Sequence, residues 1–223
     1  MAFVQRNQTQ LFSGGLAYDS SVTAGNTLLA VFSVSVGTEV SVTSVSGGGT
    51  WGNVGRVETL GTPRELSLWV CYSATGGSTT VTPSVSGTYD VIRTWIGEYD
   101  ETGQILDQYA EAAGTGTSPS SGATGTTTAA VSLVIGCFTT EFNGVTFTGP
   151  GAPWTTRHEQ ADERIHVIDQ NATSAAAFTA SGTYSSSDGW GAICATFKTD
   201  VVTASPLVGG GATAGHRRNR LAA

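Results

Sequence analysis

The first candidates for chemistry in this chain are three carboxylates that follow an apolar, strand-like run. Glu98, Asp100 and Glu101 lie close together in the sequence. Such carboxylates could supply oxygen ligands for Ca²⁺ at the edge of a β-sandwich, or an acid and a base for glycoside hydrolysis. Acidic residues after a strand also serve simply to solvate a turn, and we favour this interpretation. We therefore predict no resident metal and no cofactor, with Glu98, Asp100 and Glu101 as the calcium candidate.

The histidines do not form a catalytic pattern. The segment His158-Glu159-Gln160-Ala161-Asp162 resembles half of a zinc-protease H-E-x-x-H motif, but it ends in Asp and lies between predicted strands rather than on a helix. His158, His166 and His216 have no Ser or Cys partner at a motif spacing, and no G-x-S-x-G elbow occurs. His166 alternates with Ile165 and Val167, which predicts an exposed histidine on a strand face. We expect no catalytic residues and no enzymatic activity.

Two tryptophans are candidates for ligand binding. Trp51 and Trp154 each stand beside a Gly-rich turn. An indole face matches the apolar face of a pyranose ring, so these two side chains could stack on a glycan. Trp69, Trp95 and Trp190 lie within predicted strands and are expected in the core. Packing against a turn is the alternative role for Trp51 and Trp154.

These candidates lie in a chain that repeats itself. Residues 28–99 and residues 131–199 follow the same order of apolar runs and turns. The features that return are a Gly-rich turn before Trp51 and Trp154, the tetrapeptide Ser-Gly-Thr-Tyr at 86–89 and 181–184, and Trp95 and Trp190. The last two pairs share an offset of 95 residues, whereas Trp51 and Trp154 are 103 apart. Duplication followed by a change in one loop would leave this pattern.

Alternating apolar residues predict strands throughout both segments. In the run from Leu28 to Val36, every second residue is apolar, which is typical of a half-buried strand. We predict an all-β fold, a single antiparallel β-sandwich domain over residues 1–200 built from two related four-strand halves. Residues 113–128, composed of Ala, Gly, Thr, Ser and one Pro, are expected to form a crossing loop. Residues 201–223 are predicted to form a Gly-rich, basic, extended C-terminal tail.

The charge of the chain is low and unevenly distributed. Only 12% of the residues are charged, and 30 of the 223 are Gly. All 17 acidic residues lie within residues 1–200, so this body is acidic and should repel nucleic acid. The last 23 residues carry no acid, and their basic and terminal side chains are His216, Arg217, Arg218, Arg220 and Leu221. We expect these five residues to bind a partner.

Cysteine use and the first residues give expectations about the compartment. Cys71, Cys137 and Cys194 each lie in an apolar run, which predicts buried free thiols, with one disulfide as the alternative. The first residues do not resemble a signal peptide, and no apolar run reaches transmembrane length. We expect no membrane association and no secretion route.

Several short segments carry a resemblance to a known class of protein. They are Ala24–Leu29, Ser46–Trp51, Thr80–Thr82, Ile96–Tyr99 and Ala195–Lys198. In this order they resemble the jelly-roll β-sandwich domains common in bacteriophage virion proteins, over roughly residues 20–199. The Arg-rich, Lys-poor composition and the Gly-Gly-Gly-Ala-Thr-Ala-Gly-His-Arg-Arg ending resemble proteins of phages that infect GC-rich actinobacteria. The resemblance transfers no catalytic residue.

This resemblance implies a non-enzymatic structural role on the surface of a phage particle that is assembled in the host cytoplasm. It favours a head decoration protein that coats or stabilises the capsid, or a minor tail protein. The expected partners are the major capsid protein or other virion proteins, and further copies of the chain, as a trimer. The alternative function is a lectin-like module that attaches the particle to a host surface glycan.

Overall fold

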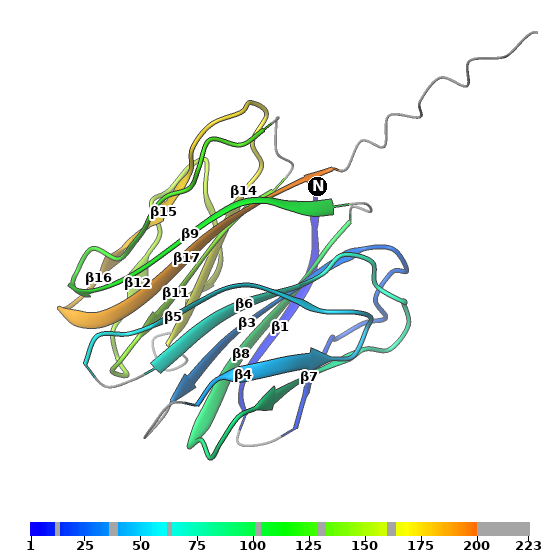
Figure 1. The fold of residues 1–223 in the computed structure, drawn as a ribbon, viewed down its shortest axis with the longest axis horizontal. Helices are drawn as coiled ribbons and strands as arrows, with labels where there is room; N and C mark the ends of the chain where they lie inside the picture. Colours follow the sequence, from blue (N-terminus) through cyan, green and yellow to red (C-terminus); the bar gives the residue numbers. More distant parts are fainter. Residues whose placement is uncertain are drawn as a thin grey trace, which may run out of the picture.

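The computed structural model describes residues 1–11, 14–35, 40–61, 64–100, 104–128, 133–159 and 164–199. Within these ranges the chain forms strands, turns and bends and no helix, so the predicted all-β sandwich is confirmed. Accordingly, no helix in them is long and apolar enough to cross a membrane. Figure 1 shows the strands stacked in layers, with the two halves of the sequence on opposite sides.

The first half of the chain is a jelly roll. Its strands are β1 (Phe3–Leu11), β2 (Leu16–Ala17), β3 (Thr27–Ser35), β4 (Val42–Ser46), β5 (Gly52–Glu58), β6 (Arg64–Cys71), β7 (Thr80–Val85) and β8 (Val91–Tyr99). They form a five-stranded sheet, β1-β8-β3-β6-β5, and a three-stranded sheet, β2-β7-β4. The pairs β1 with β8, β2 with β7 and β3 with β6 are those expected when one long hairpin of eight strands is rolled up. β5 departs from that pattern because it pairs with β6 rather than with β4.

The second half repeats this jelly roll. Its strands are β9 (Gln104–Gly116), β10 (Ser120–Ala123), β11 (Leu133–Thr140), β12 (Phe147–Thr148), β13 (Thr155–Glu159), β14 (Ile165–Gln170), β15 (Thr179–Ser181), β16 (Thr183–Tyr184) and β17 (Asp188–Thr199). The five-stranded sheet β9-β17-β11-β14-β13 matches the first sheet strand for strand, and the pairs β10-β15 and β12-β16 stand for the smaller sheet. Each half therefore contains a full jelly roll rather than the four strands predicted, and the repeat includes β1 and β9.

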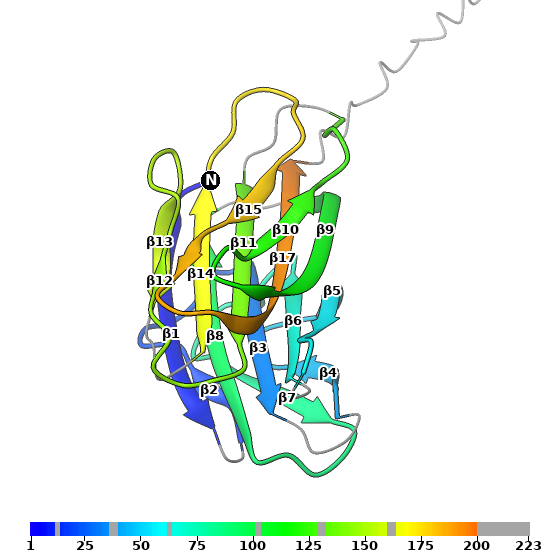
Figure 2. The same ribbon diagram turned by 90° about the vertical axis from the view of Figure 1, so that its left-hand side faces the viewer.

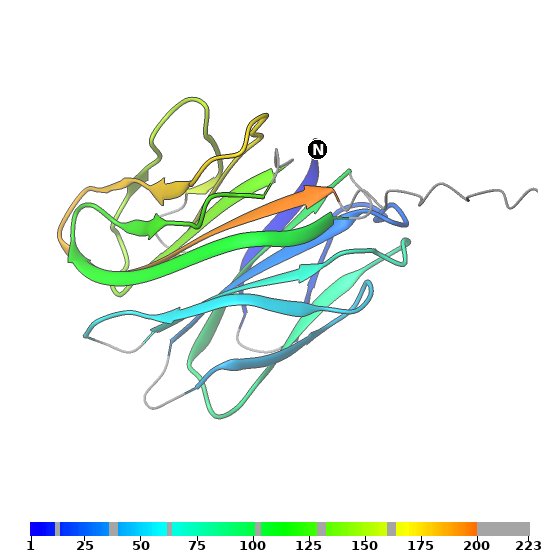
Figure 3. The same ribbon diagram turned by 45° about the horizontal axis from the view of Figure 1, so that its top comes forward.

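The two five-stranded sheets pack face to face and share an inner core (Figure 3). Buried side chains from both halves fill it, among them Leu29, Val31, Leu66, Leu68, Trp95, Ile135, Val167, Ile193 and Phe197. Ser33 and Thr139 hold corresponding positions in β3 and β11, each just after a buried phenylalanine, and their hydroxyl oxygens lie 2.6 Å apart. The two jelly rolls thus meet through equivalent residues.

Each jelly roll also has an outer core of its own. The opposite faces of the five-stranded sheets pack against the smaller sheets, around residues such as Phe32 and Trp69 in the first half and Phe138 and Trp190 in the second. Figure 2 shows β10 and β15 covering β11 and β17 in this way. Because both faces of the central strands are buried, β3, β6, β8 and β11 are buried over nearly their whole length.

The strand register corrects part of the predicted repeat. Trp95 lies opposite Val31 and points into the inner core, whereas Trp190 lies opposite Thr140 and packs in the second outer core. The two residues therefore face opposite sides of equivalent strands and are not counterparts. Matching β3 to β11 pairs Trp95 with Ile193 instead.

The Ser-Gly-Thr-Tyr tetrapeptides are also out of register. The amide of Ser41 donates a hydrogen bond to Oγ of Ser86, and the amide of Thr146 donates one to Oγ of Ser185, both at 3.0 Å. Ser86 therefore corresponds to Ser185 and not to Ser181. The shared offset of 95 residues arose by coincidence, whereas Trp51 and Trp154 each directly precede the equivalent strands β5 and β13 and are true counterparts.

Residues 113–128 are not the crossing loop that their composition predicts. β9 continues to Gly116 and β10 occupies Ser120–Ala123. Beyond β10 the amide of Thr124 donates to the carbonyl of Phe178 at 2.8 Å. Backbone pairing needs no apolar side chains, so a run of small residues can form ordered strands. Gly114 is required here, because a Cβ at this position would lie 2.4 Å from the ring of Trp190.

The cysteines are placed as their apolar surroundings in the sequence predict. The three cysteines are free and buried, as predicted, and burial raises the pKa of Cys71, Cys137 and Cys194.

Residues 201–223 lie outside the described residues. The predicted partner-binding residues His216, Arg217, Arg218, Arg220 and Leu221 belong to that segment.

Candidate functional site

The two candidate tryptophans do not form a shared platform. Trp51 precedes β5 and Trp154 precedes β13, and these strands lie at opposite edges of the stacked sheets because β5 contacts β9 while β13 pairs with β14. Trp51 packs against the first outer core and donates a hydrogen bond from Nε1 to the carbonyl of Gly47 at 2.6 Å. Trp154 packs against the second outer core. Both are half-buried, so turn packing accounts for each of them.

The predicted acidic group is dispersed. Glu98 is fully buried in β8, and its carboxylate accepts hydrogen bonds from the Gln5 side chain, the amide of Thr23 at 2.8 Å and the side chain of Asn26 at 2.7 Å. Asp100 is exposed and accepts a hydrogen bond from the amide of Ala2. Glu101 lies outside the described residues. Glu98 is therefore an internal hydrogen-bond acceptor that ties loops to β8, not a group that solvates a turn.

The histidine prediction is wrong about exposure. His166 is fully buried and stacks on Phe147 with ring centroids 4.8 Å apart. Burial, with a smaller contribution from His158, lowers the pKa of His166 to about 3. Alternation with apolar residues predicted one solvent-facing side, but both faces of β14 are covered, one by the inner core and one by the outer core. His166 is a neutral core residue.

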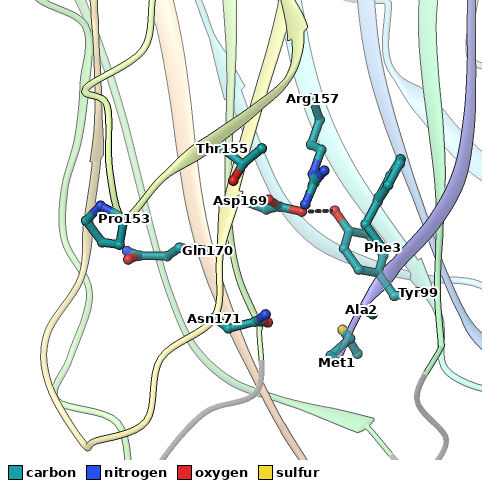
Figure 4. Close-up of a pocket in the computed structure, with 10 residues that line it drawn as sticks. All are labelled: Met1, Ala2, Phe3, Tyr99, Pro153, Thr155, Arg157, Asp169, Gln170 and Asn171. Carbon is teal, nitrogen blue, oxygen red and sulfur yellow. Dashed lines mark hydrogen bonds and ion pairs between the residues drawn. The ribbon is translucent and has the colours of Figure 1, made fainter.

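A pocket lies between the two jelly rolls, where the edge strands β1 and β13 face each other. It has a volume of about 470 Å³ and we call it the inter-sheet pocket. The first half contributes Met1, Ala2, Phe3 and Tyr99, and the second half contributes Pro153, Thr155, Arg157, Asp169, Gln170 and Asn171. Figure 4 shows these side chains arranged around the opening.

A hydrogen-bonded ion pair forms one wall of the inter-sheet pocket. Arg157 Nε lies 2.7 Å from Asp169 Oδ2, and the Tyr99 hydroxyl donates to the same oxygen at 2.9 Å (Figure 4). The Arg157 guanidinium lies over the ring of Phe3, with Cζ 4.3 Å from the ring centroid. Phe3 in turn meets Tyr99 edge to face at 5.5 Å. The wall is thus built by four residues from both jelly rolls, each of which restrains its neighbours.

Burial determines the protonation state of Tyr99. Asp169 is 3% exposed and Tyr99 is 1% exposed. Burial, followed by the negative charge of Asp169, raises the pKa of Tyr99 well above its ordinary value. Tyr99 therefore remains a hydroxyl donor at any physiological pH, which suits its bond to Asp169.

The first jelly roll has a pocket at the equivalent place. It is lined by Thr50, Trp51, Gly52, Tyr72 and Ser73 and measures about 350 Å³. Gly52 lies opposite Val70 in β6, just as Thr155 lies opposite Asp169 in β14. The strand register therefore places Val70 at the position of Asp169, and the bulge residue Val54 at the position of Arg157. Both valines are buried in the inner core.

The pocket residues were not recognised in the sequence, although a signal is present. Asp169 is a carboxylate at the end of the apolar run Ile165–Ile168, where the equivalent strand of the first half continues with Val70. Arg157 lies in a short polar strand without apolar alternation. Only the face-to-face packing of the two sheets brings these residues next to Phe3 and Tyr99.

Among the described residues, no group of three or more His, Cys, Asp or Glu side chains is placed to hold a metal ion. Comparisons of the chain with protein-family models, with curated proteins and with solved structures find no match.

Proposed function

We propose that the chain is a non-enzymatic structural protein of a bacteriophage virion and that it decorates the capsid surface. The minor tail is the other location that fits the same features. The observation that supports this most is the doubled jelly roll, since this fold recurs in viral capsid domains. Jelly rolls also serve other functions, so the proposal rests equally on the composition and sequence resemblance described above.

The shape of the molecule suits a surface subunit. The shared inner core joins both jelly rolls into one block, which can be added to a lattice as a unit. β9 is a 13-residue edge strand with Tyr109 49% exposed, and a long edge strand offers backbone groups to a neighbour. In this proposal such edges contact further copies of the chain, as a trimer, while residues 201–223 bind the major capsid protein.

Stabilisation of the capsid would follow from mass action. A protein that binds only the assembled lattice lowers the free energy of that state in proportion to the logarithm of its concentration over its Kd. The acidic body would face the solvent. Arg217, Arg218 and Arg220 would pair with acidic side chains of the capsid, at about 1 kcal/mol for each exposed contact.

Immunogold electron microscopy of particles of the encoding phage tests the location. Antibody against residues 1–200 is expected to label the whole head. Label confined to the tail would replace decoration with a minor tail role. Particles that carry no label, although the protein is made during infection, would contradict the virion proposal.

Deletion of residues 201–223 tests the proposed anchor. Because the inner and outer cores consist of residues before position 200, we expect the truncated protein to keep its fold, and we expect it to bind purified heads at least tenfold more weakly. Circular dichroism checks the fold, and cosedimentation with heads measures binding. Equal binding by the truncated and full chains would show that the tail is not the anchor.

Attachment to a host glycan is the second candidate function. The observation that favours it is the pocket beside Trp51 and Tyr72, where two aromatic side chains meet a Gly-rich turn. Trp154 does not contribute to the same surface. If this candidate is correct, Trp51→Ala should abolish saccharide binding while circular dichroism remains unchanged.

A further inference from the structure

The inter-sheet pocket contains a charged pair where the equivalent place in the molecule contains two valines. Arg157 and Asp169 of the second jelly roll correspond to Val54 and Val70 of the first. A buried ion pair commonly adds no more stability than apolar residues of similar size, because both charges must be removed from water. Folding alone therefore does not explain the pair. Its additional property is the polar surface that it presents to the pocket.

That polar surface has unused hydrogen-bonding capacity. Asp169 Oδ2 accepts from Arg157 Nε and from the Tyr99 hydroxyl. Within the described residues, no hydrogen bond engages Arg157 Nη1, Arg157 Nη2 or Asp169 Oδ1, and the Arg157 side chain is 25% exposed. Two donors and an acceptor therefore lie side by side, held by Phe3 and Tyr99. A pair of neighbouring hydroxyl groups, each able to donate and accept, matches such an arrangement.

The charges of the lining side chains indicate a neutral ligand. Arg157 and Asp169 are the only charged side chains among the ten residues that line the pocket, and their charges cancel. An anion placed here would approach the Asp169 carboxylate, and a cation would approach the Arg157 guanidinium. The two charged side chains therefore offer neither kind of ion a net attraction.

The remaining lining suits a molecule with both hydroxyl groups and apolar faces. Thr155, Gln170 and Asn171 supply a hydroxyl and two side-chain amides, whereas Phe3 and Pro153 supply apolar surface. Figure 4 shows Phe3 and Arg157 on one side of the opening and Pro153 and Gln170 on the other. The volume of about 470 Å³ lies within the range of small-ligand sites, about 300–1,000 Å³.

We infer that the inter-sheet pocket binds a small neutral saccharide, whose hydroxyl groups are held by Arg157, Asp169 and Asn171. This inference does not depend on a virion location. It also differs from the glycan candidate at Trp51, because the site uses both jelly rolls and lies at the opposite edge of the sheets. The ligand would bridge the two halves, since Phe3 and Tyr99 belong to one half and the polar residues to the other.

Saturation-transfer NMR and calorimetry with a panel of saccharides test the ligand class. The probes are the methyl glycosides of glucose, mannose, galactose and N-acetylglucosamine, with glucuronate and glucosamine as charged analogues of glucose. We expect at least one neutral glycoside to bind, and the charged analogues to bind about tenfold more weakly than it does. Absence of binding by every neutral glycoside, or preference for a charged analogue, would overturn the inference.

Matched variants test the location. The double variant Arg157→Val/Asp169→Val places at these two strand positions the residues that the first jelly roll has there, and it should abolish binding. Asn171→Ala removes an exposed side chain and should weaken binding about tenfold without affecting folding. If the double variant fails to fold, Asn171→Ala still tests whether the saccharide binds in the inter-sheet pocket. Trp51→Ala serves as the control and should bind normally. Loss of binding in Trp51→Ala, with normal binding in Asn171→Ala, would place the site in the first jelly roll and refute the inference.

Discussion

The two equivalent pockets of this molecule share a backbone and differ in chemistry. In the first jelly roll, Val54 and Val70 close the edge of the inner core with apolar side chains. In the second, Arg157 and Asp169 occupy the same strand positions and leave a larger, polar pocket. The strand pairing and the β-bulge are alike in both. The comparison shows that equivalent strand positions carry side chains of different polarity in the two halves, Arg157 and Asp169 in one and Val54 and Val70 in the other.

The ion pair of Arg157 and Asp169 depends on partners that Val54 and Val70 do not need. Tyr99 and Phe3 satisfy and cover the ion pair from the first jelly roll. Valines at the same positions need only apolar neighbours, which the inner core supplies on every side. We therefore expect the loss of one residue of this pair to destabilise the protein more than the replacement of both.

The largest expected effect comes from removing Asp169 alone. Asp169→Ala leaves the Arg157 guanidinium without its counter-ion and the buried Tyr99 hydroxyl without an acceptor. We expect the free energy of unfolding to fall by about 3 kcal/mol. Urea denaturation followed by tryptophan fluorescence measures this loss.

The double variant is the control for that prediction. Arg157→Val/Asp169→Val should lie within about 1 kcal/mol of the native protein, because valines fit the equivalent positions in the first half and only the Tyr99 hydroxyl loses a partner. Two substitutions would then be less harmful than one. A double variant that is less stable than Asp169→Ala would show that the two pockets are not structurally equivalent.

A second difference between the halves should appear as a pH dependence. His166 in β14 corresponds to Ser67 in β6, and both are buried. The pKa of His166 is about 3 in the folded protein, below its ordinary value of about 6.5, so only the unfolded chain takes up a proton between these values. The contribution of this group to stability is complete above pH 6.5 and is lost as the pH falls toward 3.

His166→Phe removes the group that takes up this proton and leaves an aromatic ring beside Phe147. Between about pH 7 and about pH 5, we expect the native protein to lose about 2 kcal/mol more stability than this variant. Chemical denaturation of both proteins at the two pH values provides the measurement. Identical pH dependence in the two proteins would mean that His166 is not buried as described.

The smallest expected effect concerns the hydrogen bond between Ser33 and Thr139, which hold equivalent positions in the two halves. The hydroxyl groups of Ser33 and Thr139 bind each other at 2.6 Å in the fully buried interface. A double-mutant cycle with Ser33→Ala and Thr139→Val should give a coupling free energy of about 1 kcal/mol. Purely additive effects would mean that the two hydroxyl groups find other partners.

Much of the fold could be predicted because its signals are local. The alternation in the run from Leu28 predicts β3 correctly as a strand but wrongly as half-buried, because both of its faces are covered; the apolar surroundings of Cys71, Cys137 and Cys194 correctly predict buried thiols. Of the three residue pairs that indicate the repeat, only Trp51 and Trp154 are true counterparts. Trp95 and Trp190, like the two Ser-Gly-Thr-Tyr tetrapeptides, are not equivalent, since residue identity at a constant offset does not report which face of a strand a side chain occupies.

The sequence by itself determined the all-β class, the repeat and the position of most core strands, because these follow from the order of apolar and polar residues along neighbouring positions. The tertiary structure alone decided that Gly-rich residues near 113–128 form strands, that Glu98 and His166 are buried, and that Arg157 meets Asp169, Tyr99 and Phe3. These features depend on pairing and packing between residues far apart in the chain. No local pattern specifies which sheet covers which face.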